Sequence, residues 1–167
     1  MPVMVKPARP TEAETVNRII RYRLYPGDAE TGDRLRGTAG AARFIWNLFM
    51  DLCELRWEMW KANPVGPKPS VSFFTLDKFF TQIRKGQPEA WLASALKQVR
   101  PDIDDYTWLQ AYASKSVKQA LKDLELAYQA YFNPAQPEAG LPHPKGKYGT
   151  TPSFGITHPL EVRGHPW

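Results

Sequence analysis

Apolar residues at helical spacing fill the stretch RFIWNLFMDLCELRWEMW, from Arg43 to Trp60. On a helix with 100° per residue, all of its polar side chains except Arg56 fall in a stripe roughly 80° wide, and apolar ones cover about 240°. The polar stripe continues just past the stretch and consists of Arg43, Asn47, Asp51, Glu54, Glu58 and Lys61. Such a helix is expected to pack against neighbours on several sides, with most of its aromatic residues in the core.

A second strong helical pattern runs from Ser114 to Phe132, SKSVKQALKDLELAYQAYF. Its apolar stripe is Val117, Leu121, Leu124, Tyr128 and Tyr131. On the opposite side, within about 60°, the same helix carries Lys115, Lys118 and Lys122, with Gln119 beside them. A three-lysine stripe is either a solvated face or a phosphate-binding face, and the sequence leaves both interpretations open.

Two shorter helices are predicted between these patterns. VSFFTLDKFFTQIRKG has Ser72 or Thr75 as its N-cap, and PEAWLASALKQV is stopped by Pro101. The aromatic pairs of the first are expected in the core: Phe73, Phe74, Phe79 and Phe80. The carboxylates that follow the second, Asp102, Asp104 and Asp105, are interpreted as loop and cap residues, because calcium loops add a glycine turn and a distal carboxylate.

The pattern changes to period 2 near the N-terminus. In NRIIRYRLYP, Ile20, Tyr22 and Leu24 alternate with Arg21 and Arg23, which predicts a half-buried strand with a basic outer face.

Asp28 is then expected to cap a short helix that carries Leu35. Gly37 and Gly40 are expected to mark the end of that helix or a tight turn. Further along, Arg56 projects from the apolar arc of the next helix, so it must pair, snorkel or contact a nucleic acid.

Composition narrows the class of protein. The chain has 167 residues with 43% hydrophobic and 13% aromatic content, enough for one core and too much for a disordered protein. A net charge of +5 fits a polyanion partner without demanding one. A single cysteine excludes an intrachain disulfide, and no apolar run approaches the roughly 20 residues of a membrane span. We expect a soluble protein of the cytoplasm, with no membrane partner and no small-molecule substrate.

Known catalytic motifs are missing from the sequence. There is no phosphate-cradling glycine loop, no GxSxG elbow and no HExxH. Cys53 lies among apolar residues, which disfavours a reactive thiolate. His143, His158 and His165 lack zinc-ligand spacing and cysteine partners. A binding module, or a part of a protein whose chemistry lies elsewhere, is expected.

Three segments in the same order resemble signatures of the TnpB (OrfB) proteins of insertion sequences. YRLYPGDAETGDRLRGTAGAARFIWN is similar to that family's strand ending in RLYP, followed by a short helix and its RF-aromatic-N motif. ASKSVKQALKDLELAYQAYF resembles its later helix with a DL pair, and GLPHPKGK resembles its GyPrFKkK motif, with Pro144 in place of the aromatic residue. Ala39 also departs from a usual aromatic, and residues 87–105 look like an insertion.

The resemblance implies a fold and a function. Members are transposon proteins with an N-terminal helix-turn-helix domain, and act as RNA-guided DNA endonucleases related to type V CRISPR effectors. The implied fold is α+β and mostly α, a helical recognition lobe inserted in a small β-barrel (wedge) domain. The expected parts are a leader (1–15), a first wedge strand and turn (16–28), the helical lobe (29–133), and a linker with a partial return to the barrel (134–167).

The same resemblance implies the partners, which are guide RNA and target DNA. Cleavage belongs to a later RuvC-like domain that uses magnesium, followed by a zinc-binding insert, so no cofactor and no catalytic residue is expected here, and the chain is expected to be truncated before that domain. Nucleoid association in a prokaryotic cytoplasm is expected. The residues predicted to contact nucleic acid are Arg21, Arg23, Arg43, Asn47, Arg56, Lys115, Lys118, Gln119, Lys122, Lys145 and Lys147.

Two other interpretations stay open. One is a conventional helix-turn-helix DNA binder with helices at Asp28–Leu35 and Arg43–Trp60. Its second helix has an apolar arc that leaves little free polar face for base reading. The other is a helical protein-interaction adaptor whose basic residues are merely solvated.

Overall fold

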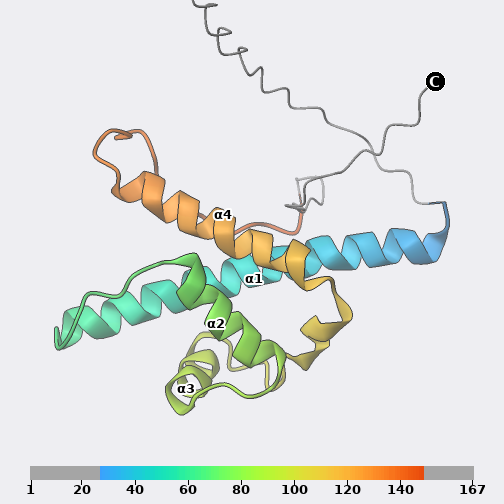
Figure 1. Ribbon diagram of the computed structural model, residues 1–167, viewed down its shortest axis with the longest axis horizontal. Helices are drawn as coiled ribbons and strands as arrows, with labels where there is room; N and C mark the ends of the chain where they lie inside the picture. The colour runs from blue at the N-terminus through green and yellow to red at the C-terminus, as the bar shows by residue number, and fades with distance from the viewer. Residues whose placement is uncertain (1–26, 149–167) are drawn as a thin grey trace, which may run out of the picture.

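The computed structural model describes residues 27–148, and this part of the chain is mostly helical (Figure 1). Its elements are α1 (Ala29–Ala62), α2 (Phe73–Arg84), α3 (Ala90–Val99), the short 3-10 helix η1 (Thr107–Ala111) and α4 (Ser114–Phe132). No strand occurs within these residues. The strands predicted at residues 17–26 and near 153–163 lie outside the described residues, so the barrel is not supported by the part of the chain that the structure describes.

Helix α1 begins where the sequence predicts a cap. The Asp28 carboxylate accepts hydrogen bonds from the backbone N–H of Thr31 at 2.6 Å and from its hydroxyl at 3.1 Å. The helix then continues without a break to Ala62, so the predicted helix end or turn at Gly37 and Gly40 is wrong.

Tertiary packing explains the glycine at position 37. A Cβ atom there would lie 2.6 Å from Cε1 of Tyr112, well inside contact distance. Nothing lies within 4 Å of a Cβ placed at Gly40. Gly37 therefore allows the Tyr112 ring to approach the backbone of α1 and does not reverse the chain. The packing of α1 as a whole outweighs the low helix propensity of its two glycines, which costs about 1 kcal/mol each.

Helices α1 and α4 lie side by side and run in the same direction, as the colours of Figure 1 show. Near their beginnings Gly37 meets Tyr112, and near their ends the ring centroids of Trp57 and Phe132 are 6.2 Å apart. The seam between them holds the largest part of the core. Its fully buried side chains include Ile45, Leu48, Phe49, Val117, Leu121 and Leu124.

Helix α2 runs antiparallel to α4. The backbone N–H of Phe73 donates to Glu125 at 3.0 Å, and Asp77, one turn later, pairs with Lys118 at 2.7 Å. Ser72 is the N-cap, accepting from the backbone N–H of Thr75 at 3.3 Å, so the cap prediction is confirmed.

The aromatic residues of α2 and α4 divide between core and surface. Phe79 and Phe80 are buried as predicted, whereas Phe74 is 85% exposed, so its assignment to the core is wrong. Tyr131 on α4 is likewise 42% exposed, although it continues the apolar stripe, and its ring meets that of Phe132 edge-on.

The three aspartates after α3 are loop and cap residues, as predicted. Asp102 pairs with Arg100 at 3.1 Å, Asp104 pairs with Lys97, and Asp105 accepts from the backbone N–H of Thr107 at 2.9 Å. The pKa of Asp102 is lowered chiefly by its hydrogen bond with Arg100. Each carboxylate therefore already has a partner in the protein.

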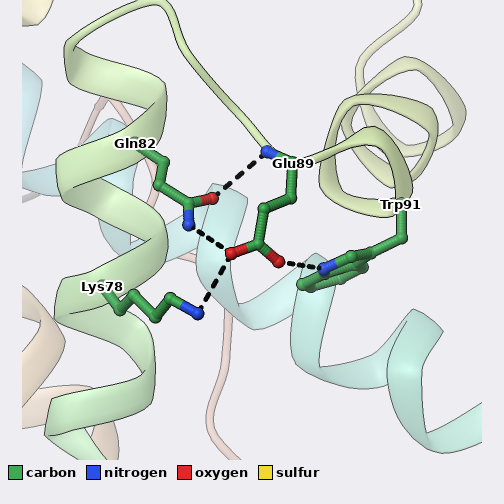
Figure 2. A network of polar contacts seen from close by, with 4 residues as sticks. All are labelled: Lys78, Gln82, Glu89 and Trp91. Atoms are coloured by element: carbon green, nitrogen blue, oxygen red, sulfur yellow. Dashed lines mark hydrogen bonds and ion pairs between the residues drawn. The ribbon is translucent and has the colours of Figure 1, made fainter.

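A polar network around Glu89 joins α2 to the start of α3 (Figure 2). The Glu89 carboxylate accepts from Gln82 at 2.7 Å, from Lys78 at 3.0 Å and from the indole N–H of Trp91 at 3.0 Å. Its own backbone N–H donates to Gln82 at 3.3 Å. These donors, Lys78 first, lower the pKa of Glu89 to about 2.

Replacement of Gly37 by alanine is expected to destabilise the protein, since the new Cβ collides with the Tyr112 ring. Gly40→Ala is the matched control and should be stabilising by up to about 1 kcal/mol, because its Cβ meets open space. Urea denaturation is expected to separate the two variants by at least ~1 kcal/mol. Equal midpoints would contradict the close packing of α1 on Tyr112.

The Glu89 network is expected to make stability depend on acid pH. The pKa of Glu89 is about 2 in the folded protein against an ordinary 4.5, so folding favours the charged carboxylate. The stability that this carboxylate contributes is therefore complete above pH 4.5 and is lost as the pH falls toward 2. The melting temperature of Glu89→Gln should therefore lie below that of the wild type above pH 4.5, and the two should converge in acid. Glu138→Gln, at another exposed glutamate, should not show this convergence.

Candidate nucleic-acid interface

An extended segment, residues 141–147, lies along α1 and is called the strap. The side-chain amide of Asn47 pairs with the backbone of Lys145: Oδ1 accepts from the Lys145 N–H at 2.7 Å, and Nδ2 donates to its carbonyl at 3.1 Å. One residue earlier, the indole N–H of Trp46 donates to the carbonyl of His143 at 2.9 Å. Three hydrogen bonds thus join segments nearly 100 positions apart.

The side chain of Lys145 strengthens the same contact. Its ammonium lies 3.7 Å from the centroid of the Trp46 ring, a cation–π distance. Loss of solvent around this ammonium lowers the pKa of Lys145, and the charge of Asp123 on α4 opposes that change. The strap is therefore placed between the polar stripe of α1 and the Asp123 side of α4.

Asn47 has a positioning role in this arrangement. Both polar atoms of its side chain are engaged by the Lys145 backbone, so it holds the strap rather than presenting a free amide. Its predicted direct contact with nucleic acid stays a prediction, and the structure gives it a different task.

The three lysines of α4 are not equivalent. Lys118 pairs with Asp77 at 2.7 Å and its ammonium lies 6.0 Å from the Phe80 ring, so it fastens α4 to α2. Lys115 and Lys122 are exposed and make no hydrogen bond or ion pair with residues 27–148. Gln119, next to them on the helix, donates to Asp123 at 2.8 Å.

Arg56 is tied to the protein as well. Its guanidinium donates to the carbonyl of Ser70 at 3.4 Å and lies 5.4 Å from the centroid of the Phe79 ring. These contacts favour the pairing interpretation over nucleic-acid contact. By contrast, Arg43 is half-buried on the polar stripe and forms no ion pair within the described part of the chain.

The remaining predicted residues lie at the end of the strap or beyond the description. Lys147 is exposed, with its ammonium 5.6 Å from the centroid of the Tyr148 ring. Arg21 and Arg23 lie outside the described residues.

One surface emerges from these placements. It runs from the polar stripe of α1 across the strap to the outer side of α4, where Gln119 separates Asp123 from the two unpaired lysines. We call it the strap surface. Its cationic side chains are Arg43, Lys115, Lys122, Lys145 and Lys147, and its carboxylates are Asp51, Glu54, Glu58 and Asp123.

Neither a reactive thiol nor a metal-binding cluster is found among the described residues. Burial raises the pKa of the Cys53 thiol to about 12, so it stays protonated at neutral pH. No group of three or more histidine, cysteine or carboxylate residues within 27–148 is arranged to hold a metal ion. In the same residues, no helix combines the length and apolar character needed to cross a membrane.

Comparison with known families gives a match over residues 16–61, to the helix-turn-helix domain of the OrfB proteins of IS605 elements. Residues 16–61 are therefore similar to the N-terminal part of OrfB-type proteins. The resemblance drawn from the sequence is thereby confirmed for this segment. No curated protein and no solved structure matches the chain.

The OrfB match bears on both partner and geometry. Helix-turn-helix domains bind DNA, so the match supports a nucleic-acid partner. However, the two helices proposed for a conventional domain, Asp28–Leu35 and Arg43–Trp60, are parts of one continuous α1. The turn between them, which that interpretation requires, is absent from the described residues.

Sequence reasoning missed Trp46 as a site residue. Its position in the apolar arc indicated only burial, and it is indeed 7% exposed. The available signal was the pairing of the RF-aromatic-N motif, which contains Trp46 and Asn47, with the GLPHPKGK motif, which contains Lys145.

Removal of the Asn47 amide is expected to loosen the strap without unfolding the helices. Asn47→Ala leaves the Lys145 N–H without its partner, a loss of about 1–3 kcal/mol locally. Hydrogen exchange at the Lys145 amide should accelerate at least about tenfold, while amides inside α4 keep their protection. Lys147→Ala, in the same strap, is the control and should leave the exchange unchanged. Unaltered exchange in Asn47→Ala would contradict the docking geometry.

Proposed function

We propose that this chain binds nucleic acid as the N-terminal portion of an RNA-guided DNA endonuclease, and that it holds guide RNA and target DNA without catalytic residues of its own. The observation that carries the proposal is the docking of the strap on α1, which unites two OrfB-like motifs and α4 in one surface that carries several lysines. The OrfB match over residues 16–61 gives independent support for a nucleic-acid partner.

The charges of the strap surface suit a duplex backbone. Double-stranded DNA carries one negative charge per ~1.7 Å of axis, and lysines that neutralise phosphates release counterions. Lys115 and Lys122 are two turns apart on α4 and lack carboxylate partners among residues 27–148, so they are available for phosphates. A guide–target heteroduplex would be held by shape and backbone contacts, without sequence reading by the protein.

In this proposal the described helices are the recognition lobe. The stretches on either side, residues 16–28 and 134–167, would contribute the small wedge barrel, with Arg21 and Arg23 on its outer face. Magnesium-dependent cleavage and zinc binding would belong to a part of such a protein beyond these residues.

A second candidate is sequence-specific binding to duplex DNA, which the helix-turn-helix match favours. Because α1 is continuous, base reading would have to use its exposed N-terminal turns, near Arg34 and Arg36, rather than a separate recognition helix. A footprint on one defined DNA site would favour this candidate, whereas binding to heteroduplex without sequence preference favours the first.

Removal of the two unpaired lysines is expected to weaken duplex binding in a salt-dependent way. Lys115→Ala/Lys122→Ala should lower the affinity for an RNA–DNA heteroduplex and reduce the slope of log K against log salt by about 2, roughly one unit per lost phosphate contact. Fluorescence anisotropy over a salt series measures both quantities.

The matched control is Lys78→Ala/Lys97→Ala, which changes the net charge equally on helices α2 and α3. It should leave the slope as in the wild type. Equal effects of the two double variants, or no binding of the wild type to any duplex at low salt, would overturn the proposal.

A further inference from the structure

A groove of about 960 Å³ lies between the C-terminal halves of α1 and α4, the loop before α2 and the strap. This volume is within the range of small-molecule and cofactor sites. The groove is distinct from the lysines of the strap surface on the outer side of α4, but the strap forms one of its walls.

One wall of the groove is aromatic. Phe132 lies 6.2 Å from Trp57 and 6.3 Å from Tyr128 between ring centroids, and its ring is nearly parallel to that of Tyr128, at 17°. Tyr131 meets Phe132 edge-on at 5.0 Å. Phe132 and Tyr131 are 55% and 42% exposed, so part of each aromatic side chain is accessible to a ligand from solvent.

Cations lie directly on this aromatic wall. The Lys68 ammonium is 4.5 Å from the centroid of Trp57 and 5.8 Å from that of Phe132, and the Lys61 ammonium is 5.6 Å from Trp57. Neither lysine forms an ion pair within residues 27–148. With Arg56, three cationic side chains line the groove against one carboxylate, Glu54.

We propose that this groove binds an unpaired nucleotide of a single-stranded nucleic acid. The base would stack on the exposed parts of the Phe132 and Tyr131 rings, and its phosphates would pair with Lys61 and Lys68. Exposed aromatic side chains beside lysines without carboxylate partners are the combination that single-strand binding sites use. A duplex cannot occupy the groove in this way, because its bases are already stacked on each other.

The inference rests on the proposed function, since it assumes a nucleic-acid partner. It adds that the ligand of the groove is single-stranded, and it names the residues that select such a ligand. The strap couples the two sites, because the hydrogen bond from Trp46 to His143 holds the wall formed by Leu141, Pro142 and His143.

The experiment measures fluorescence anisotropy of labelled eight-residue oligouridylate and oligothymidylate with the full chain. Stacking of a base on an aromatic residue contributes about 1–3 kcal/mol, so Phe132→Leu should weaken binding at least about fivefold, and Phe132→Trp should preserve it. Lys68→Ala should also weaken binding and make it less sensitive to salt. A preference for the RNA oligomer would assign the nucleotide to the guide, and equal binding would assign it to either strand.

Failure of this inference can be told from failure of the proposed function. If heteroduplex binding persists while neither oligomer binds, or if Phe132→Leu and Lys68→Ala both bind the oligomers like the wild type, the groove is not a nucleotide site. If neither duplex nor oligomer binds, the proposed function fails as well. Lys115→Ala/Lys122→Ala should weaken heteroduplex binding while leaving oligomer binding within about twofold of the wild type.

Discussion

The pairing of the Asn47 amide with the backbone of Lys145 is the interaction on which the arrangement of the site depends. An extended segment that has no sheet to join must find partners for its backbone groups elsewhere, and a side-chain amide supplies one donor and one acceptor at once. The indole N–H of Trp46 satisfies a further carbonyl, and its ring receives the lysine ammonium. Without these contacts the strap would have no defined position on α1, and neither the strap surface nor the groove would be complete.

Helix α1 is the rigid element that carries Trp46 and Asn47, and its length decides which parts of the site it can join. A helix of 34 residues extends about 50 Å, and its single seam with α4 aligns the strap at mid-length with the aromatic cluster at its end. The parallel course of α1 and α4 requires the chain to return between them, and α2, α3 and η1 make that return while covering the other side of the core (Figure 1). Arg84 at the end of α2 supports the return by donating to the carbonyls of Leu109, Gln110 and Tyr112.

Local sequence patterns predicted where the helices lie, but they did not predict the contacts between the helices. The bounds of α4 and the Ser72 cap follow from periodicity and side-chain chemistry within a few residues, and both are confirmed. Gly37 was misinterpreted because its reason, the ring of Tyr112, lies 75 positions away in sequence (112 − 37) and no local pattern contains it. For the same reason Asn47 was predicted as a ligand contact: a polar side chain on an apolar helix has the same sequence signature whether it binds nucleic acid or a distant backbone.

Some cationic side chains of this protein pair with carboxylates, and others lie on aromatic rings. This difference explains how a protein with a modest net charge can still offer cations to a polyanion. Lys118 and Lys78 pair with carboxylates of neighbouring elements, and Lys97 and Arg100 pair with carboxylates of the loop after α3, so all four contribute little field outside. Lys61 and Lys68 lie instead on indole and phenyl rings, where a quadrupole holds an ammonium without neutralising it. An ammonium on an aromatic ring is not neutralised, so it can still pair with a phosphate. The ring also holds it in place, so a nucleic-acid strand in the groove would meet cations that are already positioned. The net charge of +5 therefore does not describe the groove itself, where Arg56, Lys61 and Lys68 lie against one carboxylate, that of Glu54.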